Sequence, residues 1–345
     1  MDVRFGILLG SRRDEGQSDA DVLDRTVSLA RQAEALGLDD VWVTEHHFLE
    51  SVVSPSALAL AAYLLGATTR INVGTAVTLL PLHSPLHVAE QAVLLDHVSG
   101  GRFALGVGRG QPLVEYEVIG RGVDRWRSGM PEAVEEVLAV LRGKPVAEGL
   151  AVVPGPLTTG GPDVYVAANS EESVHLAASN GLPMLLYFDK DANTRTEMIA
   201  EYRRRGGPVD ADHAFAVFVA VTGSEAEARA LMRDRARTMV GAGNRSRHLV
   251  PVTRTPPTGT ALEEVLDTIT DRLLATHPVG SVDDCVERLV EQVAASGCTR
   301  VLCQVESPGD TANAEHQLKS LATTVLPEVR SALAAIPTPA HRPTS

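Results

Sequence analysis

The sequence predicts a (β/α)8 barrel with insertions. Short apolar segments alternate with amphipathic helical segments along most of the chain, which is typical of βαβ units and a parallel sheet. We count eight such apolar segments in the 345 residues. Barrels of this kind typically run to about 250 residues before insertions, so the length suffices. The count favours a closed barrel over an open six-stranded sheet.

The N-terminal part of the chain contains one complete βαβ unit. Residues 3–9 form an apolar run that predicts a strand, followed by a polar loop. Ser18 precedes Asp21 in a capping-box pattern, and apolar residues then recur at helical spacing up to Gly37, a glycine suited to a C-terminal cap. Residues 41–43 predict the second strand.

The same alternation continues to the end of the chain. Predicted strands cover residues 3–9, 41–43, 71–77, 103–107, 164–168, 184–188, 214–221 and 300–305. Further predicted helices cover residues 56–66, 86–98, 131–141, 171–179, 192–205, 282–295 and about 312–334, with helical stretches in 224–277. We expect a single domain over residues 1–335, with insertions near 143–163 and 241–260, and a disordered tail over 336–345.

Composition excludes several classes of protein. No segment approaches the ~20 uninterrupted apolar residues of a membrane span, and the N-terminus lacks the pattern of an export signal. The net charge of −13 repels phosphate backbones, which argues against a nucleic-acid partner. The odd set Cys285, Cys298 and Cys303 argues against a disulfide framework or a Cys-rich zinc site. It favours a reducing, cytoplasmic location.

The predicted helix over residues 56–66 is apolar on every side. An outer helix of a barrel normally keeps one polar face toward water, so this helix is expected to be buried on both faces. Its small residues permit close approach of another helix. A subunit interface is favoured over burial beneath a loop of the same chain.

Ionisable and small residues follow several predicted strands. In a barrel the functional face lies at the carboxyl ends of the strands, so these residues are expected to share one mouth. They are Glu45, His46 and His47 after the second strand, Ala76 and Val77 at the end of the third, Gly106, Gly108, Arg109 and Gly110 after the fourth, Asn169 and Ser170 after the fifth, and Tyr187 and Asp189 after the sixth.

The histidine pair is the first candidate for chemistry. Neighbouring residues on an extended segment point in opposite directions, so one of His46 and His47 can face the mouth while the other packs sideways. Both could also be ordinary loop histidines, but their position at a strand end favours function. A metal site formed by Glu45, the two histidines and another ligand is a weak alternative, because no second strand end supplies further ligands and a metal normally needs three or more.

The glycine-rich segment 106–110 superficially matches a dinucleotide-binding fingerprint. The match fails because Gln111 replaces the third glycine and Pro112 interrupts any helix start. The better interpretation is a glycine turn that lets a flat ligand approach the backbone, with Arg109 as an anion partner. Arg127, placed just before the next predicted helix, could supply a second cation.

Hydroxyl side chains surround the start of the predicted helix 171–179. Asn169 and Ser170 precede the helix and Ser173 lies in its first turn, an arrangement suited to a phosphate. A plain N-cap explains Ser170 equally simply. Together with two arginines at the same rim, the hydroxyl groups favour a phosphate-bearing cofactor.

Four segments carry a specific resemblance. They read LGLDDVWVTEHHF, LLGATTRINVGTAVTLLP, AEQAVLLDHVSGGRFALGVGRG and NGLPMLL. In this order and spacing they resemble the bacterial luciferase family of flavin-dependent monooxygenases, especially its α-subunit-like members. The resemblance is dense over residues 5–127, resumes over 164–186 and is faint over 190–275.

The resemblance implies a function and its partners. A (β/α)8 barrel would bind reduced FMN, react it with molecular oxygen to a flavin hydroperoxide, and insert one oxygen atom into a small organic substrate. A separate flavin reductase would supply the reduced FMN, since the chain has no convincing nicotinamide site. A homodimer would form through the helices at 56–66 and 86–98.

The resemblance also assigns the family's site residues to positions of this sequence. His46 matches the family's catalytic histidine, and Ala76-Val77 falls on its non-prolyl cis peptide beneath the flavin ring. Asn169 replaces an acid and Ser173 a threonine of the phosphate loop. The resemblance implies cofactor contacts at Glu45, Ala76, Val77, Gly108, Arg109, Arg127, Asn169, Ser170 and Ser173.

One departure and two alternatives remain. Luciferases carry a cysteine at the position of Gly108, where glycine leaves more room and removes a thiol, so light emission is not implied. A deazaflavin-dependent hydride-transfer oxidoreductase of the same superfamily is one alternative. A non-catalytic flavin-binding partner subunit is the other, although retention of the 45–47 motif argues against it. The substrate stays open among an aldehyde, a ketone and an aromatic or polyketide precursor.

Overall fold

The computed structural model describes residues 2–14, 16–110, 115–245, 257–306 and 311–336. Within them, eight parallel strands form a closed ring, because β3 pairs with both β2 and β5. The predicted (β/α)8 fold is therefore confirmed. The strands are β1 (Arg4–Leu9), β2 (Asp40–Val43), β3 (Asn72–Thr75), β5 (Phe103–Gly108), β6 (Asp163–Ala168), β7 (Met184–Leu186), β8 (Ala214–Phe218) and β11 (Arg300–Gln304).

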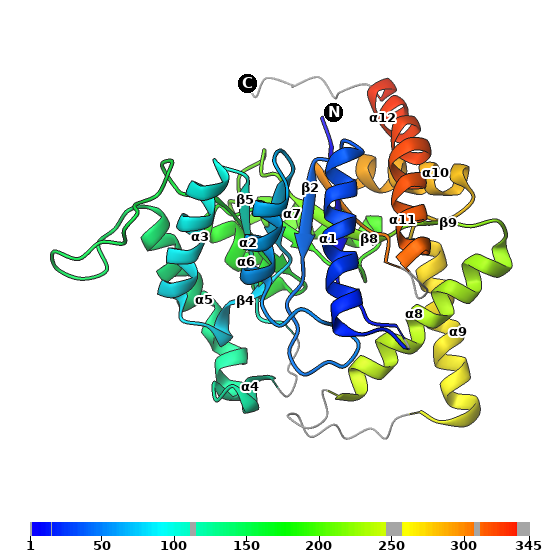
Figure 1. The fold of residues 1–345 in the computed structure, drawn as a ribbon, viewed down its shortest axis with the longest axis horizontal. Helices are drawn as coiled ribbons and strands as arrows, with labels where there is room; N and C mark the ends of the chain where they lie inside the picture. Colours follow the sequence, from blue (N-terminus) through cyan, green and yellow to red (C-terminus); the bar gives the residue numbers. More distant parts are fainter. Residues whose placement is uncertain (1, 15, 111–114, 246–256, 307–310, 337–345) are drawn as a thin grey trace.

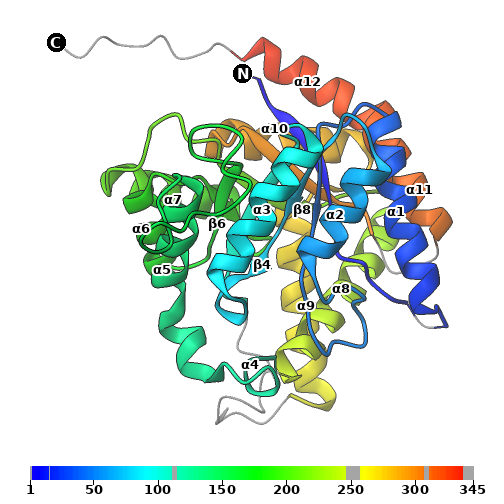
Figure 2. The ribbon, with the colours of Figure 1, turned by 60° about the vertical axis from the view of Figure 1, so that its left-hand side comes forward.

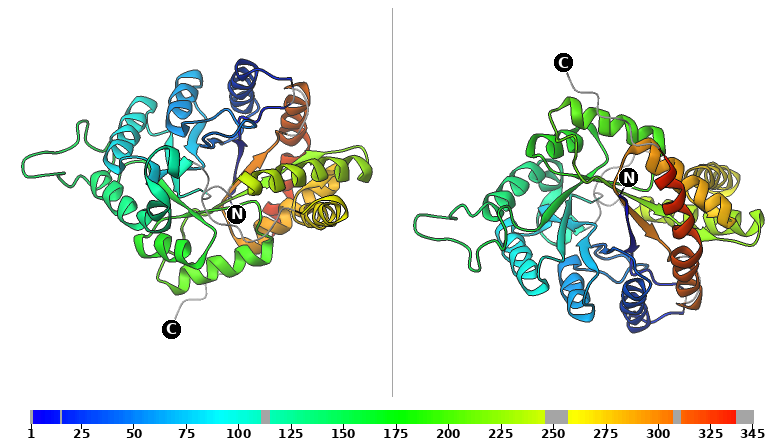
Figure 3. Two further views of the ribbon diagram at one scale, coloured as in Figure 1. Left: turned by 90° about the horizontal axis from the view of Figure 1, so that it is seen from below. Right: turned by 90° about the horizontal axis from the view of Figure 1, so that it is seen from above.

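Helices surround this ring on all sides (Figure 1; Figure 3). Those of the outer layer are α1 (Asp19–Ala35), α2 (Ala57–Ala67), α3 (Pro85–Ser99), α5 (Gly122–Leu141), α6 (Glu171–Asn180), α7 (Ala192–Arg204), α10 (Val282–Ser296), α11 (Thr311–Ser320) and α12 (Leu326–Ala335). A π-helical turn, Leu321–Val325, joins α11 to α12, where the sequence predicted one continuous helix.

Helix α5 begins well before its predicted start. The prediction placed Pro131 at the first turn, which proline tolerates, but Pro131 lies inside the helix. The helix includes Gly122 and Gly129, two weak helix formers that concealed its true beginning. Arg127 consequently lies within α5, not before it.

Two predicted strands are divided. The segment 71–77 ends as β3 at Thr75, and the chain resumes after a cis peptide bond as β4 (Thr78–Leu79), which pairs with β5. The segment 214–221 leaves the barrel after Phe218. Its last residues form β9 (Ala220–Val221), which pairs with β10 (Val279–Gly280) in a separate two-stranded sheet.

Side chains fill the barrel toward the amino ends of its strands. Trp42 packs across the interior so closely that a Cβ on Gly74 would lie 2.5 Å from its ring. Closer to the amino ends of the strands, the Arg300 guanidinium donates to Asp40 and Asp212, each at 2.6 Å. This plug closes one end and leaves the carboxyl ends as the mouth, which points down in Figure 1.

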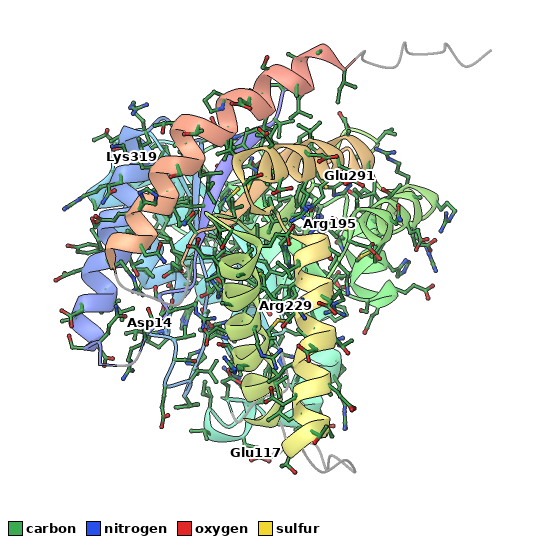
Figure 4. The ribbon with its side chains drawn as sticks, turned by 90° about the vertical axis from the view of Figure 1, so that its right-hand side faces the viewer. Asp14, Glu117, Arg195, Arg229, Glu291 and Lys319 are labelled. Carbon is green, nitrogen blue, oxygen red and sulfur yellow. The ribbon has the colours of Figure 1, made fainter. Side chains whose placement is uncertain are left out.

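A helical hairpin lies beside the mouth. Helices α8 (Glu225–Arg245) and α9 (Gly259–Thr276) run side by side, and Figure 4 shows Arg229 on α8 facing α9. Arg229 donates to Asp271 at 2.7 Å, and Arg233 pairs with Asp267 one turn further along α8. These ion pairs join the two helices into one unit. In Figure 1 the short helix α4 (Glu115–Val118) lies on the other side of the mouth from α8 and α9, and Figure 2 shows it at the same end of the molecule as their lower ends.

The first predicted insertion is an extended loop between α5 and β6. Its only regular feature among the described residues is an isolated bridge between Ala147 and Leu150. The loop projects away from the barrel (Figure 1). Most of the second predicted insertion, residues 246–256, and most of the predicted tail, residues 337–345, lie outside the described residues.

Helix α2 is buried on one face only. Leu58, Leu64 and Leu65 pack against the barrel, but the opposite face leaves Tyr63 61% exposed. The expectation of burial on both faces is thus not met within one chain. On the neighbouring helix α3, Val98 is 70% exposed.

The three cysteines are deeply buried. Cys285, Cys298 and Cys303 have no exposed surface, and none forms a disulfide. Burial raises the pKa of the Cys285 thiol to about 12 and that of Cys298 to about 11. In the part of the chain that the structure describes, no helix is both long and apolar enough to cross a membrane.

Candidate active site

Glu45, at the end of β2, is the centre of a buried hydrogen-bond network. Its Oε1 lies 2.7 Å from His83 Nε2 and 3.3 Å from His47 Nε2, and its Oε2 accepts from the Ala57 backbone at the start of α2 at 3.2 Å. Burial alone would raise the carboxyl pKa, but the hydrogen bonds from His47 and His83 outweigh it and lower the pKa to about 2. Glu45 is therefore an ionised anchor that ties β2, α2 and the β3–α3 connection together.

His46 is oriented differently from its neighbour. Its backbone N–H donates to Ser54 O at 2.8 Å, while its ring forms no hydrogen bond within the described residues. His47 contacts the Glu45 carboxylate, whereas the His46 ring does not, so the two histidines differ in their partners. Burial lowers the pKa of His46 to about 4, partly opposed by Glu45 and reinforced by His47 and Arg12. The imidazole is neutral at neutral pH and has one donor and one acceptor available.

The floor of the mouth carries the expected cis peptide bond between Ala76 and Val77. Both side chains are partly exposed there. The expectation that Gly108 leaves more room is wrong, because a Cβ on it would lie 2.7 Å from Val77 Cγ2 and 3.1 Å from Ala167 Cβ. The Val77 side chain already occupies the space beside Gly108.

Arg109, which follows β5, lies beside the start of α6. Its Nη1 is 3.5 Å from Glu172 in the first turn of that helix, and its guanidinium stacks 4.6 Å from the centre of the Trp126 ring. Its carbonyl accepts from the Tyr116 hydroxyl at 2.6 Å. The expected meeting of Arg109 with the 169–173 segment is therefore present, and Trp126 is a contact that the sequence did not indicate.

The start of α6 is capped by its own hydroxyl groups. Ser173 Oγ accepts from the backbone N–H groups of Asn169 at 3.0 Å and Ser170 at 2.9 Å, and Ser170 Oγ caps the Ser173 amide in return. The N-cap role of Ser170 is thus confirmed. A helix start is also electropositive, so the cap is compatible with an anion beside it.

Arg127 does not join this corner in the structure. It is 62% exposed on α5 and pairs with Asp124 of the same helix at 3.4 Å. The residue of this segment that reaches Arg109 is Trp126. We therefore define the phosphate corner as Arg109, Ser170 and Ser173.

Two residues near Glu45 were not predicted from the sequence as site residues. His83 follows Pro81-Leu82 and could have been found as a third histidine close to a strand end. Glu115 begins α4, is 1% exposed, and its Oε2 has no hydrogen-bond partner among the described residues. Burial raises its pKa to about 7, so this carboxyl group titrates near neutrality. No motif marks it in the sequence.

A second set of missed residues lies across the mouth. Arg235 of α8 is 3% exposed, and Arg12 follows β1. The guanidinium of Arg235 lies 4.5 Å from the centre of the Phe218 ring at the end of β8. Elsewhere in the described ranges, no group of three or more His, Cys, Asp or Glu side chains is arranged to hold a metal ion.

Comparison with known proteins identifies relatives along nearly the whole chain. The family model described as luciferase-like monooxygenase matches residues 3–300. The alkanal monooxygenase alpha chain of Photorhabdus laumondii subsp. laumondii is 28% identical over 357 residues, covering 94% of this chain and 97% of that protein.

Solved structures share the fold. The monooxygenase RslO1 from Streptomyces bottropensis has a TM-score of 0.76 at 22% identity, covering 94% of this chain and 99% of that one. The oxygenating constituent of 3,6-diketocamphane monooxygenase from Pseudomonas putida, in complex with FMN, has a TM-score of 0.72 at 18% identity, covering 95% and 98%. An F420-dependent secondary alcohol dehydrogenase has a TM-score of 0.71 at 18% identity, covering 96% and 100%.

Proposed function

This chain belongs to the luciferase-like monooxygenase family, and we propose that it uses reduced FMN and molecular oxygen to insert one oxygen atom into a small organic substrate. The observation that carries the proposal is the presence at one mouth of the phosphate corner and of the neutral, unpaired imidazole of His46. The first suits the anionic end of a cofactor, and the second suits proton transfer.

The residues of the mouth fit FMN. Arg109 and the capped start of α6 would hold its phosphate, since a guanidinium and a helix N-terminus both favour a dianion. The partly exposed Ala76 and Val77 would offer an apolar surface to the flat ring. When bound in its reduced form, FMN supplies the activation of oxygen.

His46 and Glu45 would have different roles, in proton transfer and in positioning. His46 would hold or transfer a proton at a ring nitrogen, because its low pKa leaves the ring neutral and able to accept. Glu45 would keep the end of β2 in place through His47 and His83. Helix α8 lies over part of the mouth and would help to exclude water from the reaction.

The test is rapid mixing of the protein with reduced FMN and oxygen. The wild type should give a transient absorbance, distinct from those of reduced and oxidised FMN, that outlasts the signal of FMN alone. In His46→Ala, substrate oxidation should fall about 10²- to 10⁴-fold, the usual contribution of a positioned acid or base. His87→Ala, which removes an exposed histidine of α3, is the matched control and should leave the rate unchanged. Equal rates in His46→Ala and wild type would refute the assigned role.

A second candidate is hydride transfer with a deazaflavin cofactor. It is supported by the similarity in fold to the F420-dependent dehydrogenase. Equilibrium binding of FMN and of F420 to the purified chain separates the two proposals. Turnover by this chain alone, with reduced FMN supplied chemically, would dismiss a non-catalytic subunit, and dependence on an added reductase for sustained turnover would support a separate reductase.

We also propose a homodimer through α2 and α3. The exposed faces of these adjacent helices carry Tyr63 at 61%, Leu94 at 49% and Val98 at 70% exposure. Large apolar side chains gathered on one outer face are typical of a subunit interface. Val98→Asp should shift the sedimentation coefficient from dimer to monomer, whereas Val209→Asp, at a 76% exposed valine outside these helices, should not.

A further inference from the structure

We propose that Arg12 and Arg235 bind a negatively charged oxygen of the substrate, so that this enzyme acts on organic anions such as carboxylates and enolates. We call these two residues the arginine pair. That the bound anion is a substrate rests on the proposed monooxygenase function, whereas the anion site itself is inferred from the structure alone.

The arginine pair is built into the wall of the mouth. Arg235 donates to the carbonyl of Glu306, which follows β11, and covers the ring of Phe218 at the end of β8. Arg12 donates from Nη2 to Thr238 Oγ1 at 3.2 Å, one turn beyond Arg235 on α8. Helix α8 therefore crosses the carboxyl ends of β8, β11 and β1, and both guanidinium groups lie beneath it.

The charge of Arg12 acts on that of Arg235. Burial lowers the pKa of Arg235 to about 9 and repulsion by Arg12 adds to this effect, while the carboxylates of Glu306, Asp234 and Asp14 oppose it only in part. A buried guanidinium beside a second cation is costly unless an anion compensates it. The arrangement therefore calls for a negative charge at this wall.

The described residues do not supply a carboxylate paired with either arginine. Among the described residues, no carboxylate oxygen lies within ion-pair distance of Arg12 or Arg235. The nearby Glu306 directs its oxygens to the backbone N–H groups of Gly10 and Arg12, and lies 3.9 Å from Arg25. Glu306 thus binds the loop after β1 and forms no ion pair with Arg12 or Arg235, although its charge partly offsets that of Arg235.

The surroundings suit a polar head group next to the reacting centre. Gln304, the last residue of β11, is buried, and its carboxamide makes no hydrogen bond to the described residues. Tyr187, which follows β7, lies close enough to both arginines that their charges oppose the rise of its pKa caused by desolvation of its hydroxyl group. Arg12 also lowers the pKa of His46. An anion on the pair would therefore lie near the catalytic candidate.

This site is distinct from the phosphate corner. Around the ring the strand order is β3, β2, β1, β11, β8, β7, β6 and β5. The phosphate corner follows β5 and β6, whereas the arginine pair follows β1 and lies against the ends of β11 and β8. The two cationic sites are separated by β2 and β3 on one side and by β7 on the other, so one ligand end can occupy each.

The experiment compares matched pairs of ligands that differ in charge. Binding of 2-naphthoate and 2-naphthamide, and of decanoate and decanamide, is measured by calorimetry on the full chain, with and without oxidised FMN. We expect each carboxylate to bind about 10- to 100-fold more tightly than its amide, the range of a charge-assisted hydrogen bond. Arg12→Gln and Arg235→Gln should each reduce this preference at least tenfold. Arg229→Gln, an exposed arginine of the same helix, is the control and should keep it.

Further measurements protect the test. If Arg235→Gln fails to fold, Arg235→Lys keeps the positive charge and should retain the preference, while Arg12→Gln still tests the pair. Equal binding of carboxylate and amide, or a preference that survives both glutamine variants, would overturn the proposal. So would carboxylates that compete with FMN, because they would then occupy the phosphate corner. Failure to oxidise any substrate while the preference persists would count against the monooxygenase function and leave the anion site standing.

Discussion

The two walls of the mouth are constructed on different principles. On the wall formed by β2, β3, β5 and β6, charges are compensated within the protein, since Glu45 receives hydrogen bonds from two histidines and a helix start. On the wall formed by β1, β8 and β11, the arginine pair lies together without a carboxylate in ion-pair distance among the described residues. Glu45 on the first wall has its partners within the protein, whereas we propose that the arginine pair obtains its partner from the ligand.

The first wall also contains a contrast of its own. Glu45 and Glu115 are both buried carboxyl groups, yet the pKa of one falls to about 2 and that of the other rises to about 7. Hydrogen bonds from histidines overcome the burial of Glu45, whereas burial dominates at Glu115. Two acids in one site with pKa values pushed apart can serve as a fixed charge and a proton carrier.

The largest expected difference between the walls is in cofactor affinity. Arg109→Gln removes the cation at the start of α6 and should weaken FMN binding about 100-fold, or about 2.7 kcal/mol. Arg12→Gln should change FMN affinity less than threefold, because its charge belongs to the other wall. Fluorescence titration of FMN measures both. If Arg12→Gln weakens FMN as much as Arg109→Gln, the division into two walls does not hold.

An effect of similar size, on stability instead of cofactor affinity, separates Glu115 from Glu45. Because folding raises the pKa of Glu115, the contribution of its carboxyl group to folding stability is fully present below pH 4.5. That contribution is lost as the pH rises through about 7. Glu115→Gln imitates the neutral form and should stabilise the protein at pH 8 by up to about 3 kcal/mol, because the rise of the pKa from 4.5 to about 7 corresponds to about 1.36 kcal/mol per unit. The gain should vanish near pH 5.

Denaturant unfolding at pH 5 and pH 8 measures this effect. Glu117→Gln, on the exposed side of the same short helix, is the matched control and should be neutral at both values. A gain from Glu115→Gln that does not depend on pH would show that its carboxyl group is already ionised in the folded protein.

The smallest effect concerns the floor between the walls. Gly108→Ala places a Cβ 2.7 Å from Val77 Cγ2 and should cost about 1–3 kcal/mol of unfolding free energy. In a Val77→Ala background the cost should fall by at least about 1 kcal/mol, which a double-mutant cycle measures. Gly241→Ala, which meets no atom within 4 Å, controls for the effect of adding a methyl group. Additive costs would mean that Val77 does not fill this space.

The sequence was sufficient for the fold and for one wall only. Alternating apolar runs predict the strands because a parallel strand must be buried on both faces, and the 45–47 motif is contiguous at a strand end. Arg12 and Arg235 lie far apart in the chain and meet only where α8 crosses the strand ends. Each alone resembles any surface arginine, so no local pattern could reveal them.

The other incorrect predictions from the sequence also concern features that depend on the folded structure. Helix α5 was shortened because glycines at 122 and 129 lower local helix propensity, while packing against the barrel sets its true start. The room beside Gly108 was misjudged because the side chain that fills it, Val77, comes from a different strand. Burial and neighbouring groups, which decide the pKa of Glu115, exist only once the chain is folded.

The burial of the three cysteines has a practical consequence for studying oxidation by this protein. A thiol reacts as its thiolate, and the raised pKa values of Cys285 and Cys298, together with their full burial, leave almost none. Under the proposed function, peroxide released in unproductive cycles should therefore spare them, and turnover can be followed without added reductant. A single cysteine introduced at Val153, which is 89% exposed, would be the one reactive thiol of the chain, ready to carry a fluorescent or spin label.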